Sequence, residues 1–76
     1  MKLNYDNNTD SLYINFNDKP GVDSFEVSKD FIVDIDSNGQ VVGLEILNIK
    51  DKVDLDSVIF DSFPVKDIKF VGQENT

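Results

Sequence analysis

The sequence of 76 residues contains no cysteine and no histidine. Without cysteine the chain has no disulfide framework, no thiolate metal site and no cysteine nucleophile. Without histidine it lacks the side chain that most often transfers protons near neutral pH. It also has no glycine-rich phosphate loop and no serine in a recognisable nucleophile motif. We therefore expect a non-catalytic protein that needs no cofactor.

Positive charge is also scarce. Seven basic residues stand against 15 acidic ones, which gives a formal net charge of −8. Binding to nucleic acid depends on lysine and arginine neutralising phosphates, so direct nucleic-acid binding is not expected. A basic protein partner would be favoured in encounter and in selectivity. Excess charge that serves only solubility is the ordinary alternative.

No hydrophobic run is long enough to span a bilayer. The first ten residues, MKLNYDNNTD, lack a basic region followed by an apolar stretch, so we expect a cytoplasmic protein that does not associate with membranes. The length predicts a single domain over residues 1–76 with a core that is marginal for independent stability. Self-association or a partner would add the missing burial.

The clearest structural signal is a β-hairpin in residues 31–47, where Asn38 and Gly39 form a turn signal between runs rich in valine and isoleucine. A two-residue loop fixes the register, because side chains alternate between the two sides of a strand. The register places three apolar pairs on one side: Ile35 with Val42, Val33 with Leu44, and Phe31 with Ile46. The other side is mostly polar, so the pattern specifies the pairing.

The same stretch also fits a calcium-binding pattern through Asp34, Asp36, Asn38, Gly39 and Glu45. A calcium hand needs a helix on each side of its loop, and both flanks here alternate as strands do. We therefore prefer the hairpin. A weak divalent-cation site made by Asp34, Asp36 and Glu45 is kept as an alternative, although a solvated outer face is the preferred explanation of these carboxylates.

The remaining segments predict the rest of the fold. Alternating apolar residues indicate strands over residues 2–5, 11–16 and 22–27, which with the hairpin make an antiparallel meander of five strands. Four apolar residues at spacings of three and four predict a short helix ended by Pro64: Leu55, Val58, Ile59 and Phe63. Packed on one face of the sheet, it would complete an α+β fold. Residues 65–71 are compatible with a further C-terminal strand, and we expect a frayed tail over residues 72–76.

Four apolar side chains fall on the side of the sheet away from the predicted helix: Tyr13, Ile32, Val41 and Leu47. The first three are the candidate partner-binding residues. Such residues can form a surface for a second copy of the chain or for a different protein. Scattered exposed apolar residues are nevertheless common.

Two separated motifs resemble a known family. The first motif is Tyr5, Asp6, Asp10, Leu12, Tyr13, Ile14 and Phe16, and the second comprises Glu26, Val27, Ile32, Asp34, Asp36, Gly39, Val41, Val42, Gly43, Glu45, Ile46 and Leu47. In this order, over residues 3–49, they resemble the small prokaryotic family DUF2283, a domain of unknown function. The resemblance implies a small α+β domain with an antiparallel sheet. Some relatives are encoded beside a small toxin-like protein, which implies an antitoxin-like binding role.

The preferred hypothesis is thus a protein-binding or self-associating module, with a homo-oligomer or a basic protein as its partner. The divalent-cation domain is the alternative. A third hypothesis is a stable homodimer whose ligand no motif reveals.

Overall fold

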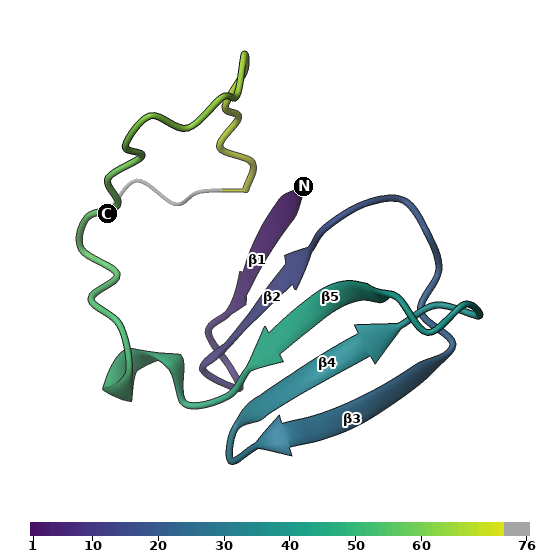
Figure 1. Ribbon diagram of the computed structural model, residues 1–76. Coiled ribbons are helices and arrows are strands. Elements are labelled where there is room, and N and C mark those ends of the chain that lie inside the picture. Colours follow the sequence, from purple (N-terminus) through teal and green to yellow (C-terminus); the bar gives the residue numbers. More distant parts are fainter. Residues whose placement is uncertain (73–76) are drawn as a thin grey trace.

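The computed structural model describes residues 1–72 and contains one five-stranded antiparallel sheet (Figure 1). Its strands are β1 (Lys2–Asp6), β2 (Ser11–Asn15), β3 (Asp23–Ser28), β4 (Phe31–Ile35) and β5 (Val41–Ile46). A single 3₁₀ turn, η1 (Ile49–Asp51), follows β5. The predicted number of strands and their antiparallel pairing are confirmed.

The order of the strands differs from the predicted meander. Across the sheet the order is β1-β2-β5-β4-β3, so β5 pairs with both β2 and β4. The connection over residues 16–22 consequently leads from β2 to the far edge. The compositions of the strands are compatible with this order, because β5 (VVGLEI) is apolar enough for the centre and β3 (DSFEVS) carries the polar side chains typical of an edge.

The central hairpin has the predicted register but a different turn. Val33 pairs with Leu44 and Phe31 with Ile46, as predicted, whereas Ile35 pairs with Val41 through a bulge. The loop has three residues, because the backbone N–H of Asp36 donates to the carbonyl of Gln40 at 2.9 Å. The Asp36 carboxylate accepts N–H bonds from Asn38 and Gln40, which stabilises this longer turn.

The alternation of side chains gives the sheet two different faces. The apolar face carries nine side chains at paired positions of the five strands: Leu3, Tyr5, Leu12, Ile14, Phe25, Phe31, Val33, Leu44 and Ile46. The polar face carries the positions between them, including Asn4, Tyr13, Asn15, Ser24, Glu26, Ile32, Asp34 and Glu45.

The turn η1 is tied to two other turns at the same end of the sheet. The N–H of Ile49 donates to the carbonyl of Asp10 in the β1–β2 turn at 3.0 Å. The Lys52 ammonium contacts the Asp30 carboxylate in the β3–β4 turn at 2.9 Å. Lys52, followed by the amide of Asn48, lowers the pKa of Asp30 below its ordinary value. Three connections that are distant in sequence therefore meet here.

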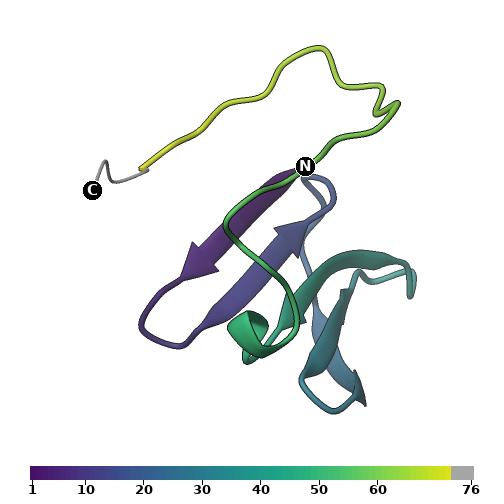
Figure 2. The ribbon, with the colours of Figure 1, turned by 90° about the vertical axis from the view of Figure 1, so that its left-hand side faces the viewer.

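The same turn covers one end of the apolar face. Lys50 lies 5.9 Å from the centre of the Tyr5 ring, and Lys52 lies 5.9 Å from the centre of the Phe31 ring. Both rings belong to the row of the apolar face nearest η1. Ile49, which precedes Lys50, is fully buried with an exposed fraction of 0%. In Figure 2, η1 accordingly lies in front of the sheet.

The predicted helix is wrong, and the α+β assignment fails with it. Residues 53–72, here called the C-terminal arm, contain no helix or strand, so residues 65–71 do not extend the sheet. A helix ended by Pro64 would have about nine residues, and isolated helices shorter than about 12 to 15 residues are marginal in water. The domain is therefore mostly β.

The C-terminal arm rises beyond the sheet and is exposed along its length (Figures 1 and 2). Of the predicted frayed tail, residues 73–76 lie outside the described residues. Within residues 1–72, no helix has the length and apolar character needed to cross a membrane.

Candidate functional site

A hydrogen-bonded cluster occupies the polar face. The Tyr13 hydroxyl donates to Asp34 Oδ2 at 2.6 Å, and the Ser24 hydroxyl donates to Asp34 Oδ1 at 2.7 Å. The strands β2, β4 and β3 thus each supply one member. Strand β5 lies between β2 and β4, and its Gly43 pairs with Asp34 of β4. The phenol reaches Asp34 only by passing over this glycine.

Gly43 makes room for the phenol. A Cβ atom at this position would lie 2.9 Å from Tyr13 Cζ and still closer to the Tyr13 hydroxyl oxygen. Cβ atoms essentially never approach other heavy atoms this closely. The glycine is thus required by the close approach of the ring, and it lets the two side chains bond across an intervening strand.

The surroundings of the Tyr13 hydroxyl keep it protonated. The bond to Asp34, followed by partial burial and by the negative charges of Asp34 and Glu45, raises the pKa of Tyr13 above its ordinary value. The phenol therefore stays neutral at physiological pH. A neutral phenol that already donates to a carboxylate is a poor nucleophile and a poor base, and the two hydrogen bonds to Asp34 link three strands.

Replacing Tyr13 with phenylalanine should therefore lower the free energy of unfolding by about 1.5 kcal/mol at neutral pH, because one bond to a charged acceptor is lost from a half-buried site. The raised pKa means that the bond contributes fully below the ordinary tyrosine pKa of about 10 and is lost as the pH rises through the folded-state pKa. Urea unfolding of both proteins over this range should show a difference that shrinks in strong alkali. A difference independent of pH would contradict the role assigned to the hydroxyl.

The three carboxylates of the predicted cation site have separate roles. Asp34 accepts the bonds from Tyr13 and Ser24. Asp36 is buried, with an exposed fraction of 6%, and its carboxylate accepts the N–H bonds of the turn. Glu45 lies in the row between Tyr13 and Ile32. Residues 1–72 contain no group of three or more acidic side chains placed to hold a metal ion.

The structure brings together only two of the three predicted partner residues. Tyr13 and Ile32 both pair with Glu45, so they share one row of the polar face, and both are half-buried. Val41 is exposed but pairs with Ile35 at the opposite end of β5. These residues do not make one continuous apolar surface.

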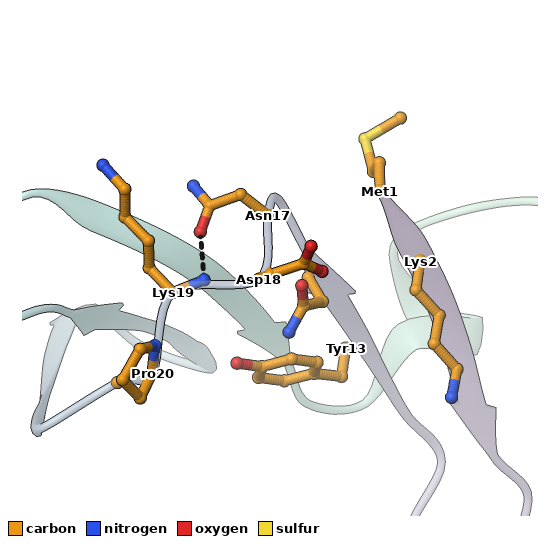
Figure 3. Close-up of a pocket in the computed structure, with 9 residues that line it drawn as sticks. Met1, Lys2, Tyr13, Asn17, Asp18, Lys19 and Pro20 are labelled. Carbon is orange, nitrogen blue, oxygen red and sulfur yellow. Dashed lines mark hydrogen bonds between the residues drawn. The ribbon is translucent and has the colours of Figure 1, made fainter.

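A shallow pocket lies beside the Tyr13 ring, at the start of β1 and the connection that follows β2 (Figure 3). The residues around it include Lys2, Asn17, Asp18 and Lys19. Figure 3 shows the amino groups of Lys2 and Lys19 pointing away from each other, on opposite sides of the ring. Because its charged groups diverge, the pocket offers no convergent set of polar contacts for a ligand.

The apolar face is the surface that the sequence reasoning missed. Leu3 at one edge is 55% exposed and Phe25 at the other is 49% exposed, and Ile14, Leu44 and Val33 between them are half-buried. The alternation in the sequence identified most of these residues. The sequence predicted that a helix over residues 55–63 would cover these side chains, and the structure has no helix there.

Comparison with known proteins identifies a family. The model of the family described as "Protein of unknown function (DUF2283)" matches residues 2–50. No curated protein and no solved structure matches the chain. The matched segment contains all five strands and ends within η1, so the sheet, the Tyr13 cluster and Ile49 lie inside it and the C-terminal arm outside it. The chain belongs to the DUF2283 family.

Proposed function

We propose that this domain is a non-catalytic protein-interaction module whose apolar face binds another polypeptide. The observation that carries the proposal is the row from Leu3 to Phe25, which spans all five strands and has no second layer over it. Among the described residues, the only hydrophobic side chains classed as buried are Val42 and Ile49. A sheet normally buries its apolar face against another layer, and a partner would supply that layer.

The shape and chemistry of the face favour a polypeptide over a small ligand. Small molecules bind in concave sites that surround most of their surface. Here the apolar side chains are spread over five strands instead of lining a cavity. Large exposed apolar patches mark surfaces for proteins or membranes. The proposal includes a second copy of the chain and, in an antitoxin-like role, a different protein with basic groups around its contact surface, which the net charge of −8 would attract.

The proposal is tested by placing a photoreactive phenylalanine analogue at Phe25 of the full chain in its host cells. We expect cross-links to a defined polypeptide, identified by mass spectrometry. The matched control carries the analogue at Glu26, the next residue of β3, which is exposed on the polar face. The same product should disappear when Leu3, at the far edge of the face, is replaced by glutamate.

Equal cross-linking from Phe25 and Glu26, or none from Phe25, would overturn the proposal. Leu3→Glu changes an exposed side chain, so circular dichroism should confirm that the variant still folds. A product that persists in the folded Leu3→Glu variant would also contradict binding through the apolar face.

A further inference from the structure

The exposed surface of the chain is larger than that of a folded monomer of its mass. The accessible surface is 6436 Å². The scaling relation for monomeric proteins gives about 4,700 Å² for 8.6 kDa, so the excess is roughly 1,700 Å². Each subunit of an obligate dimer buries about 1,000 to 2,500 Å². The excess therefore matches what one such interface would remove from water.

The dimensions of the chain agree with its surface. The radius of gyration is 13.7 Å, whereas a compact domain of 76 residues has about 11 Å. The difference comes from the C-terminal arm, which extends beyond the sheet (Figure 1). The apolar face is not covered by a second layer of the chain, and the C-terminal arm is exposed. Both features are typical of one subunit of an intertwined dimer.

The positions of the carboxylates favour a second copy of the chain over a basic protein as the partner of the apolar face. Among the strand positions on this face, the only carboxylate is that of Asp23, at the corner where β3 begins. Asp34, Glu26 and Glu45 lie on the polar face, and Asp10 and Asp30 lie in turns. Two copies can consequently meet through their apolar faces without opposed carboxylates, although each has a net charge of −8. A basic partner would find few anions there to bind.

The C-terminal arm starts on the side where this second copy would lie. Figure 2 shows η1 in front of the sheet and the arm leaving it on that same side. The arm carries exposed apolar residues throughout, among them Ile59, Ile68 and Phe70, and the rings of Phe60 and Phe63 stack at 5.4 Å. Their own sheet does not cover them, and a partner on the apolar face would come within their reach.

We propose that two copies associate through their apolar faces about a two-fold axis, and that the C-terminal arm of each packs along the partner's sheet at the β3 edge. This inference rests on the proposed function and names the partner. In a two-fold dimer both subunits use the same surface patch, so one interface buries the apolar face and the C-terminal arm of each subunit. Lys66 in the arm would lie near Asp23, the acidic residue at the corner of the apolar face.

The first test is light scattering of the untagged full chain at low and at high salt. We expect a mass of twice 8.6 kDa in both conditions, because the contact is apolar and added salt only screens the repulsion between like-charged copies. A monomer at micromolar concentration would overturn the inference. If the chain is a monomer and Phe25 cross-links to another protein, the proposed function stands and the dimer inference fails. If Phe25 gives no cross-link, the proposed function and the dimer inference both fail.

The second test detects arm exchange, and the absence of native cysteine makes it direct. Chains with Phe60→Cys, Phe63→Cys or Ile68→Cys, each carrying a tag, are mixed with untagged Phe25→Cys chains and oxidised. We expect disulfides between tagged and untagged chains from at least one arm position. The matched control is Glu26→Cys, which presents the thiol on the polar face of the same strand.

Arm exchange is overturned if Glu26→Cys and Phe25→Cys react equally. It is also overturned if chains that carry both an arm cysteine and Phe25→Cys form only intramolecular disulfides. In that case each arm folds back on its own sheet.

Discussion

Replacement of Ile49 by alanine is expected to lower the free energy of unfolding by about 3 kcal/mol, within the 2 to 5 kcal/mol typical of such truncations. Ile49 is fully buried and lies where η1 joins the turns at Asp10 and Asp30. Its truncation would leave a cavity where η1 meets these turns. Urea unfolding at a fixed chain concentration measures the change, since a self-associating chain is more stable at higher concentration.

The matched control is Val22→Ala. Val22 precedes β3, its side chain is 63% exposed, and its backbone N–H bond to Ile35 survives the substitution. It should change the free energy of unfolding by less than about 0.5 kcal/mol. Equal effects of the two substitutions would show that η1 is not part of the folded core.

The five strands were predictable because each alternates clearly between apolar and polar residues. The same alternation fixed the pairing of Val33 with Leu44, since a slip by one residue would expose the apolar side. The turn was less predictable, because Asn38 and Gly39 suggested a two-residue loop and the buried Asp36 carboxylate stabilises a three-residue one. The order of the strands depends on tertiary pairing of β5 with β2, which no local pattern specifies.

The error over the helix decided how the two faces were interpreted. Leu55, Val58, Ile59 and Phe63 have helical spacing, but a helix of about nine residues that does not pack on the sheet is marginal in water. Because the predicted helix would cover the apolar face, the sequence indicated Tyr13, on the other face, as part of a binding surface. That tyrosine is instead engaged with Asp34. The contact needs Gly43 on β5, the strand between the two partners, and Tyr13 is distant from both Gly43 and Asp34 in sequence. It therefore could not be inferred from local sequence.

Gly43→Ala is expected to lower the free energy of unfolding by about 3 kcal/mol, through overpacking against the Tyr13 ring and loss of its bond to Asp34. The sign of this effect is informative. Glycine in the interior of a strand normally costs stability relative to alanine, so alanine in open space would stabilise the chain. Urea unfolding at a fixed chain concentration measures the change. A stabilised variant would mean that the ring does not lie over Gly43.

A double-mutant cycle separates the ring from the backbone as the cause. In a chain that already carries Tyr13→Ala, the added Gly43→Ala should cost less than about 1 kcal/mol, because the remaining close contact is with the carbonyl oxygen of Ile14 at 3.2 Å. An unchanged cost in that background would assign the effect to the backbone of β2. A reduced cost would show that Gly43 is required by the phenol, which links β2 to β4 at the centre of the sheet, opposite the proposed binding face.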